Sequence, residues 1–245
     1  MKLSKRMQAV AAMVSPGNVL ADIGTDHGYV PIALVQEHVI PRAIAMDINE
    51  GPLERATAHI REYHLESLIE TRRSNGVEML REGEADSILI AGMGGELIIG
   101  ILTAGEAVCK KARELILQPQ SEIDEVRKYL RSNQYKIVDE DMVYEDGKYY
   151  PMMHVVPEED TFWSNKDPHT IEVCEMYGPI LLKNGNPVLR KFLVWQHKML
   201  MQILTQLNEQ VSSEKIERRI EEVKHQLWCN ESAYSILGAI KDAGI

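Results

Sequence analysis

Short apolar runs alternate along the first part of the chain with longer stretches whose apolar residues recur at helical spacing. Leu3, Met7, Val10 and Val14 predict an amphipathic helix at the start, which Pro16-Gly17 ends. Five apolar runs then predict buried strands, at residues 19–23, 43–46, 68–72, 87–91 and 115–117. Because helical stretches separate these runs, the pattern indicates βαβ units and an α/β fold with a parallel sheet.

The pattern changes after the fifth strand. Ser121, with Asp124 three residues later, is typical of a capping box and predicts one more helix start. Residues 135–144 and 148–156 are two extended runs joined by Glu145-Asp146-Gly147, a hairpin signal that predicts an antiparallel pair at the sheet edge. Strand signals stop near residue 160, so the sequence predicts one domain over residues 1–160 and a second over residues 161–245.

The second domain is expected to be helical. Positions that step by four and three residues form two seams, the first at Leu189, Leu193, Gln196, Leu200, Ile203 and Leu207, and the second at Ile216, Ile220, Val223 and Leu227. Two seams joined by a short polar turn predict an antiparallel helical hairpin, a loose coiled coil.

Composition narrows the class of protein. The 245 residues are 44% hydrophobic and 26% charged, which suits a protein with a full core rather than a disordered chain. No apolar run reaches the roughly 18 residues that cross a bilayer, and no signal-peptide core follows the first residues, so we expect a cytoplasmic protein without a membrane partner. Its three cysteines, odd in number and far apart, fit neither a disulfide framework nor a zinc site, and no metal is expected.

Charge is distributed unevenly between the two parts. The net charge of −10 argues against a protein that binds nucleic acid without regard to sequence. Residues 1–160 hold 17 Lys and Arg against 27 Asp and Glu, whereas residues 161–245 hold ten of each. The neutral second part can therefore still meet a polyanion.

The most informative stretch runs from Val19 to Pro31, where the first strand turns into a helix. Gly24 and Gly28 are four residues apart, unlike the glycines of the dinucleotide-binding fingerprint, and Asp22 and Asp26 lie beside them. Two carboxylates would repel a pyrophosphate and attract a cation, so the loop favours a ligand with ammonium and sulfonium groups such as S-adenosylmethionine. The alternative is an ordinary strand-to-helix turn with a surface aspartate.

Later strand ends carry further candidates. Asp47 ends the second strand, where a carboxylate can accept the ribose hydroxyls of a nucleoside, although it could also be a helix cap. Asn75-Gly76 closes the third strand, either beside an adenine ring or as a plain turn. Gly92-Met93-Gly94-Gly95 closes the fourth strand and allows a substrate ring to approach the backbone, unless it is merely a tight connection. Gln118-Pro119-Gln120 could line the same mouth.

Together these motifs resemble the class I S-adenosylmethionine-dependent methyltransferases, and within them the bacterial TrmK family of tRNA adenine-N1-methyltransferases. The resemblance covers nearly the whole chain, with one departure at Gln120, where the family pattern has Asn. It rests on Leu3-Ser4-Lys5-Arg6, residues 22–31, Met46-Asp47-Ile48-Asn49, Gly92-Met93-Gly94-Gly95, Leu117-Gln118-Pro119 and the helical tail.

The resemblance implies a Rossmann-like methyltransferase sheet of parallel strands with an antiparallel edge hairpin, followed by a C-terminal coiled-coil domain. The implied reaction is methylation of N1 of an adenine in the tRNA D-arm, at tRNA position 22, with the tail helping to hold the tRNA. The implied cofactor pocket consists of Asp22, Gly24, Thr25, Asp26, His27, Gly28, Asp47, Ile48, Asn75, Gly76, Gly92 and Met93.

Adenine N1 has a free lone pair, so catalysis by such an enzyme is mostly placement of an unpaired base. Asp26 is the candidate catalytic residue, because a carboxylate near the exocyclic amine would stabilise the cationic product, although Asp26 could serve the cofactor alone. Candidate substrate-binding residues are Arg6, Tyr29, Gly94, Gln118, Arg190 and Lys191.

Two alternatives remain open. One is the same chemistry on a small molecule or a protein, which the acidic first domain favours. The other is a non-catalytic adaptor whose helical hairpin binds a partner protein, against which the intact Asp22, Gly24, Asp47 and Gly92 argue. The oligomeric state stays open, with a monomer favoured.

Overall fold

The structure is a computed structural model that describes residues 3–211 and 213–242. The chain forms two compact units, with the division between Thr161 and Phe162. We describe each unit by itself.

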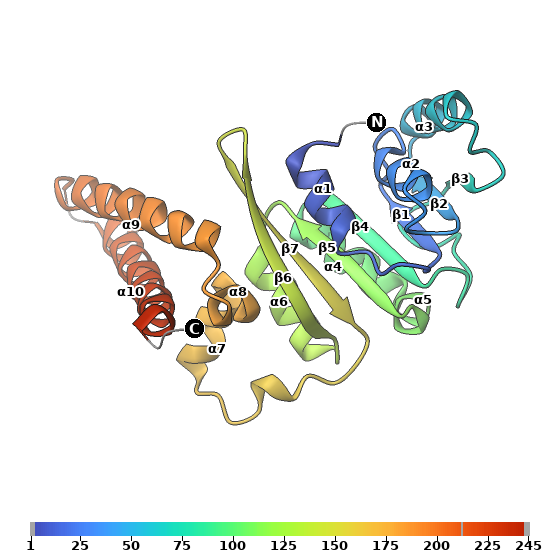
Figure 1. Cartoon of the computed structure of the whole chain (residues 1–245). Helices are drawn as coiled ribbons and strands as arrows, with labels where there is room; N and C mark the ends of the chain where they lie inside the picture. Colours follow the sequence, from blue (N-terminus) through green and yellow to red (C-terminus); the bar gives the residue numbers. More distant parts are fainter. Residues whose placement is uncertain (1–2, 212, 243–245) are drawn as a thin grey trace. The chain divides into compact units, whose positions relative to one another are not determined.

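A single sheet organises the first unit (Figure 1). Its strand order is β3-β2-β1-β4-β5-β7-β6, in which β1 to β5 are parallel and β7 runs antiparallel to both β5 and β6. The strands are β1 (Leu20–Ile23), β2 (Ala43–Asp47), β3 (Ile69–Arg73), β4 (Ser87–Met93), β5 (Glu114–Pro119), β6 (Lys136–Glu145) and β7 (Lys148–Val156). The predicted α/β sheet with an antiparallel hairpin at its edge is confirmed.

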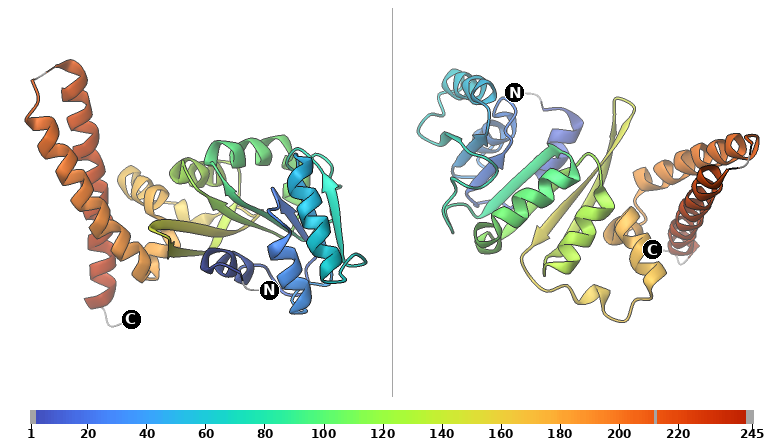
Figure 2. Two further views of the ribbon diagram at one scale, coloured as in Figure 1. Left: turned by 90° about the horizontal axis from the view of Figure 1, so that it is seen from above. Right: turned by 180° about the vertical axis from the view of Figure 1, so that it is seen from behind.

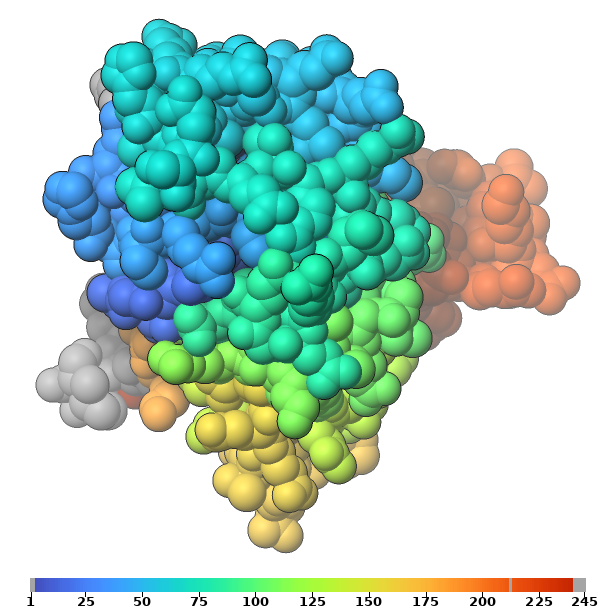
Figure 3. Space-filling model, turned by 90° about the vertical axis from the view of Figure 1, so that its right-hand side faces the viewer, coloured from blue at the N-terminus to red at the C-terminus, as the bar shows by residue number. Residues whose placement is uncertain are grey.

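Helices cover both faces of this sheet, with α1 and α2 on one face and α4 and α6 on the other (Figure 2). All four residues of β1 are buried, as a parallel strand covered on both sides requires. Figure 3 looks at the β3 side of this unit, where α3 and the segments around β3 form the surface. The helices are α1 (Lys5–Ala12), α2 (Tyr29–Gln36), α3 (Glu50–Glu62), α4 (Gly95–Ala104), α5 (Glu106–Lys111) and α6 (Ile123–Ser132).

The first helix starts and packs as its sequence pattern predicts. The Ser4 side chain caps α1 by accepting a hydrogen bond from the Met7 backbone N–H. Val10 and Val14 are buried in the same core cluster as Ile32 of α2 and Leu89 of β4. This cluster fixes α1 against the face of the sheet that carries α2.

The start of α6 corrects one prediction. The N-cap is Glu122, in the left-handed region at φ 45°, and it makes no side-chain capping bond. The Ser121 hydroxyl donates to Glu122, and the Ser121 carbonyl accepts from the Gly95 N–H. The predicted capping box at Ser121 and Asp124 is therefore wrong, because Ser121 is engaged by the neighbouring loop.

A polar cluster holds the amino ends of the central strands together. The carboxylate of Glu114, the first residue of β5, accepts hydrogen bonds from Ser15 and Ser87 and lies 3.0 Å from His154 Nε2. Burial by itself raises the pKa of Glu114, but the hydrogen bonds from His154, Ser15 and Ser87 outweigh it and bring the pKa to about 2. The hydrogen-bonded Glu114 cluster thus fills the space at the amino ends of the strands. The carboxyl ends of the strands remain available for a ligand.

The second unit is helical. The short 3₁₀ turn η1 (Thr161–Trp163) spans the division between the units, and α9 and α10 run antiparallel as a hairpin (Figure 2). Leu200, Val223 and Leu227 are buried between these two helices, on the seams that the sequence predicts. Its helices are α7 (Pro168–Tyr177), α8 (Pro179–Lys183), α9 (Pro187–Asn208) and α10 (Glu214–Asp242). Across the described part of the chain, every helix is too short or too polar to traverse a bilayer.

Candidate functional site

A cavity of about 280 Å³ opens at the carboxyl ends of the central strands. The strand order reverses between β1 and β4 at this edge, which is where open α/β sheets bind ligands. The walls come from α1, the β1–α2 turn, and the ends of β4 and β5. Among the lining residues are Arg6, Asp22, Gly24, Asp26, Tyr29 and Gly92, all predicted site residues, together with Gln120.

The β1–α2 turn is built around two glycines with left-handed backbones, Gly24 at φ 73° and Gly28 at φ 69°. The backbone N–H groups of Gly24 and Thr25 both donate to the Met46 carbonyl, at 2.8 and 2.9 Å, which ties the turn to β2. A Cβ atom at Gly24 would lie 2.0 Å from Cε of Met93. Position 24 therefore favours glycine for its left-handed backbone, and a methyl group there would also displace the flexible end of the Met93 side chain.

Asp22 places a carboxylate at the base of the cavity, with only 7% of the residue exposed. Burial raises its pKa to about 6, the charges of Asp26 and Asp47 push in the same direction, and an interaction with Thr25 opposes them. Two carboxylates in the cavity lining, with the charge of Asp47 close enough to act on Asp22, favour a cationic ligand there, because a positive group would offset the cost of burying Asp22 in its ionised form.

Rings stack beside the cavity. His27, at φ 61°, stacks on Tyr29 with 5.1 Å between centroids, and His59 of α3 stacks on both. The Nδ1–H group of His59 donates to the His27 carbonyl at 3.0 Å, and His27 Nε2 lies 3.3 Å from the carboxylate of Asp26. Tyr29 and His59 also line a neighbouring cavity of about 540 Å³ with Tyr63. Sequence reasoning missed His59, because nothing in its local sequence marks it and only the fold brings α3 to the turn.

The predicted residues after β2 and β3 lie around the cavity rather than in its lining. Asp47 Oδ1 accepts a 2.7 Å hydrogen bond from the Asn49 N–H, and Ile48 is half exposed. The Asn75 amide donates to Glu78 at 2.7 Å. A Cβ atom at Gly76 would lie 2.9 Å from the Ile101 side chain, so packing against α4 already accounts for this glycine.

The loops after β4 and β5 are joined by backbone hydrogen bonds. The Gln120 N–H donates to the Met93 carbonyl at 2.8 Å, and the Gly95 N–H donates to the Ser121 carbonyl at 3.1 Å. Gly94 precedes α4 as its N-cap, and Gly92 faces Arg6 and Gln120 across the cavity mouth. The absence of a side chain at Gly92 leaves this mouth open, whereas a Cβ atom at Gly94 would lie 3.0 Å from the Ser121 hydroxyl, outside the lining.

Arg6 reaches the cavity from α1. Its guanidinium donates to Gln118 Oε1 at 2.9 Å and lies over the Tyr150 ring, 5.5 Å from the centroid. The backbone N–H groups of Lys5 and Arg6 donate to the carboxylate of Glu145 at the tip of the β6–β7 hairpin, at 2.7 and 3.1 Å. Desolvation raises the pKa of Glu145, but the hydrogen bonds from Arg6 and Lys5 together outweigh this effect. The pKa of Glu145 is therefore lower than that of an ordinary glutamate. Gln118 is fully buried, and it contributes to the mouth through its hold on Arg6.

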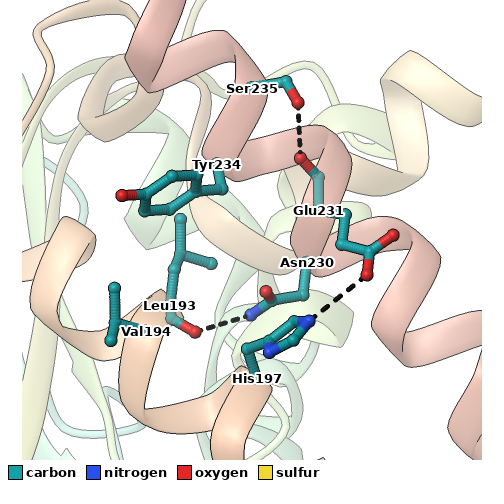
Figure 4. Close-up of a pocket in the computed structure, with 7 residues that line it drawn as sticks. All are labelled: Leu193, Val194, His197, Asn230, Glu231, Tyr234 and Ser235. Atoms are coloured by element: carbon teal, nitrogen blue, oxygen red, sulfur yellow. Dashed lines mark hydrogen bonds and ion pairs between the residues drawn. The ribbon is translucent and has the colours of Figure 1, made fainter.

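Two predicted substrate contacts lie in the helical unit and differ in environment. Arg190 donates to the Leu237 carbonyl at 2.7 Å and its guanidinium lies 5.5 Å from the Tyr234 ring centroid, so it joins α9 to α10. Lys191, in contrast, is exposed. Near Arg190, a pocket of about 370 Å³ lies between the two helices, with Asn230 donating to the Leu193 carbonyl and His197 paired with Glu231 (Figure 4).

Comparison with known proteins agrees with this geometry. Residues 3–153 match the model of a methyltransferase domain family, so the chain belongs to the methyltransferase class. The chain is 35% identical over 227 residues to the Bacillus subtilis tRNA (adenine(22)-N(1))-methyltransferase, which covers 93% of this chain and 94% of the relative.

Solved structures extend the similarity to the whole fold. The crystal structure of the B. subtilis m1A22 tRNA methyltransferase TrmK matches with a TM-score of 0.85 and 33% identity, covering 95% of this chain and 99% of that one. Streptococcus pneumoniae Sp1610 in complex with S-adenosyl-L-methionine matches with a TM-score of 0.82 and 29% identity, covering 95% and 100%. Within the methyltransferases, the chain belongs to the TrmK family of tRNA (adenine-N1)-methyltransferases. The resemblance found in the sequence is confirmed.

Proposed function

We propose that the protein transfers a methyl group from S-adenosylmethionine to N1 of the adenine at position 22 in the D-arm of tRNA. The observation that carries this proposal is the acidic cavity around Asp22 at the carboxyl edge of a sheet whose whole fold matches TrmK. The acidic surroundings and the glycine turn suit a cationic nucleoside and would disfavour a pyrophosphate.

The residues of the cavity fit this cofactor. When bound, S-adenosylmethionine supplies an electrophilic methyl group on a sulfonium. Asp22, Asp26 and Asp47 offer the carboxylates that attract its positive groups and accept its hydroxyls, and Gly24 and Gly92 leave room for close approach of the backbone. The other proposed pocket residues are Thr25, His27, Gly28, Ile48, Asn75, Gly76 and Met93.

Placement of the adenine is the main task of the remaining site residues. The stack of His27, Tyr29 and His59 offers an aromatic surface beside the cavity, which suits a base taken out of its pair. The carboxylate of Asp26, 65% exposed in its side chain, is available to accept a hydrogen bond from an exocyclic amine. A negative charge at that point stabilises the positive charge that the adenine ring acquires, which assigns Asp26 its catalytic role.

The two units divide the work in this proposal. Residues 1–160 bind the cofactor and carry the chemistry, and residues 161–245 help to hold the tRNA. On α9, Lys191, Trp195 and Lys198 recur at spacings of four and three residues and are exposed, so they share one face. A face with two lysines and an exposed tryptophan suits phosphate contact and base stacking.

Methyl transfer from labelled S-adenosylmethionine to unmodified tRNA tests the function. We expect N1-methyladenosine in the nucleosides of the product, and none from a matched tRNA with guanine at position 22. Methylation that persists on the substituted tRNA would reject the position. Cofactor binding without transfer to any tRNA would favour the adaptor or a different substrate.

The role of Asp26 needs a separate measurement. We expect Asp26→Asn to lower kcat by roughly a hundredfold while the Kd for S-adenosylmethionine changes only a few-fold. The matched control is Asp146→Asn in the hairpin turn, which removes one carboxylate outside the cavity lining. Equal losses in kcat and in cofactor affinity would make Asp26 a binding residue only.

A further inference from the structure

Four side chains of metal-binding types converge between α7 and α10 of the helical unit. His169 and Glu172 lie one turn apart on α7, and His225 and Cys229 lie one turn apart on α10. One ring nitrogen of His169, one carboxylate oxygen of Glu172 and Sγ of Cys229 all lie within 4.8 Å of one another. His225 Nε2 lies 2.6 Å from Glu172 Oε1 and 3.8 Å from Cys229 Sγ.

The hydrogen bonds around His169 determine which of its nitrogens has a free lone pair. The Ser232 hydroxyl donates to the Trp228 carbonyl at 2.9 Å, so its oxygen accepts from His169 Nε2–H, also at 2.9 Å. Nδ1 then carries the lone pair, and it is buried with no hydrogen-bond partner in the described chain. A buried acceptor without a partner is costly, and a metal ion would complete it.

We propose that this cluster binds one Zn²⁺ ion, with His169, Glu172 and Cys229 as ligands and His225 completing the coordination. Mixed nitrogen, sulfur and oxygen ligands suit Zn²⁺, and ligand atoms of a tetrahedral zinc site lie about 3.3 to 3.7 Å apart. The 3.8 Å between Cys229 Sγ and His225 Nε2 is close to that separation. Binding forms a Zn–S bond and releases the Cys229 thiol proton to solvent. The proton that His225 Nε2 shares with Glu172 is also released to solvent, and two metal–ligand bonds replace the Glu172–His225 contact.

The surroundings of the cluster match a metal site open on one side. The Trp228 ring stacks on His169 at 3.4 Å between centroids and fixes the orientation of the imidazole. Cys229 is fully buried, whereas the side chains of Glu172 and His225 are 41% and 48% exposed, so an ion can enter from solvent. A purely structural hydrogen-bond cluster would explain the Glu172–His225 pair but would leave His169 Nδ1 unsatisfied.

This metal site was not predicted from the sequence, because the three widely spaced cysteines match no zinc motif. The ligands here follow a His-x-x-Glu spacing on one helix and a His-x-x-x-Cys spacing on another, more than fifty residues later. Each spacing puts two side chains on one helical face, and the packing of α7 against α10 brings the faces together. An ion held this way would tie α7 to α10 and stabilise the helical unit.

Titration of the full-length, chelator-treated protein with Co²⁺ tests the site. We expect one Co²⁺ per chain, an absorption band for thiolate-to-metal charge transfer, and displacement of Co²⁺ by one equivalent of Zn²⁺. Cys229→Ser should abolish the band, whereas Cys109→Ser, at a buried cysteine of the other unit, should keep it. Absence of a stoichiometric ion, or a band that survives Cys229→Ser, would overturn the proposal.

A second pair of variants avoids the buried position. Glu172→Gln keeps the size of an accessible side chain, and we expect it to weaken Zn²⁺ binding about tenfold or more while far-ultraviolet circular dichroism stays unchanged. The control is Glu221→Gln, which removes an exposed carboxylate of α10 that pairs with Lys224. Equal Zn²⁺ affinities for the two variants would reject Glu172 as a ligand and with it the proposed site.

Discussion

The guanidinium of Arg6 on α1 donates a 2.9 Å hydrogen bond to the buried side-chain oxygen of Gln118 at the end of β5. The bond crosses the mouth of the cavity, and Gly92, which has no side chain, lies beside it. Arg6 is therefore fixed at the place where the proposed adenine would enter, while its backbone N–H is held by Glu145. Because the Arg6 side chain is already held in one conformation, it can position a substrate without a further loss of side-chain conformational entropy.

We expect Arg6→Ala to lower kcat/KM for tRNA by roughly ten to a hundredfold, with the Kd for S-adenosylmethionine changed by less than about threefold. The control is Lys5→Ala, which removes the same charge from the adjacent position of α1. Steady-state kinetics and cofactor titration of both variants measure the difference. If Lys5→Ala is equally impaired, general charge on α1 rather than the position of Arg6 determines the rate.

Asp22→Asn should stabilise the protein without cofactor at pH 7.5, by on the order of 2 kcal/mol, because the pKa of Asp22 is raised to about 6 in the fold from about 3.9 in the unfolded chain. The sign follows from the upward shift. The fold favours the protonated carboxyl, so wild type loses stability relative to the variant as the pH rises from about 4 to about 6. Thermal unfolding of both proteins between pH 4 and pH 8 measures this.

The same substitution should weaken cofactor binding, since the ionised carboxylate is what attracts the cation. For wild type, affinity for S-adenosylmethionine should fall as the pH drops below about 6 and Asp22 takes up a proton. A variant that binds the cofactor as tightly as wild type at pH 7.5 would remove Asp22 from the binding site.

Gly24→Ala and Gly17→Ala form a matched pair. Both glycines are left-handed, at φ 73° and φ 83°, so each alanine should cost about 1 to 2 kcal/mol of stability. Only at Gly24 would the added methyl group meet Met93, whereas Gly17 faces open space. We therefore expect a loss of cofactor affinity of roughly tenfold or more in Gly24→Ala alone, and equal cofactor affinity in the two variants would contradict a role for this contact.

Arg127→Met should destabilise the protein by about 3 to 5 kcal/mol. Arg127 of α6 and Glu140 of β6 are almost fully buried, with 2.9 Å between Nε and Oε1, so the substitution leaves a buried carboxylate without its guanidinium. Lys128→Ala breaks the adjacent exposed pair with Glu125 and should cost less than about 0.5 kcal/mol. Urea unfolding compares them, and similar midpoints for the two variants would show that burial does not decide the cost.

Charge reversal at Lys191 and Lys198 together should raise the Kd for tRNA by roughly tenfold or more and make binding less dependent on salt. The double reversal of Lys215 and Lys224 on α10 changes the net charge equally and serves as the control. Binding measured at several salt concentrations distinguishes a specific face of α9 from overall charge. If the Lys191 and Lys198 variant binds tRNA as tightly as wild type, this face of α9 does not contact tRNA.

The central strands could be predicted to within a few residues, because β1, β2 and β5 are nearly continuous buried runs such as Leu20–Ile23 between turn residues. The edge hairpin followed from Asp146-Gly147, and the tail seams from Leu200, Val223 and Leu227. The start of α6 could not be predicted, because the Ser121 hydroxyl bonds the adjacent Glu122 and its carbonyl accepts from Gly95, a long-range contact that the local sequence does not reveal.

For the candidate site, glycines and carboxylates at strand ends were the reliable signals, and Asp22, Gly24, Asp26 and Gly92 all line the cavity. Their spacing reflects a local turn, which sequence encodes directly. His59 joins Tyr29 from a different helix, and no periodicity marks such a long-range contact. Arg190 is a different case. The sequence suggested a surface charge for tRNA contact, but in the fold its guanidinium donates to the Leu237 carbonyl within the helical unit.

The helix that carries Arg6 is fastened at both ends by carboxylates made much later in synthesis. Glu114, which holds Ser15, follows it by 99 residues, and Glu145, which holds the Arg6 backbone, follows by 139. During synthesis α1 is made well before the β6–β7 hairpin, so the Lys5 and Arg6 N–H groups gain the Glu145 carboxylate only after that hairpin has been translated. A nascent chain that ends before Glu145 therefore has the glycine turn of the cavity but lacks the carboxylate that anchors the Arg6 backbone at its mouth.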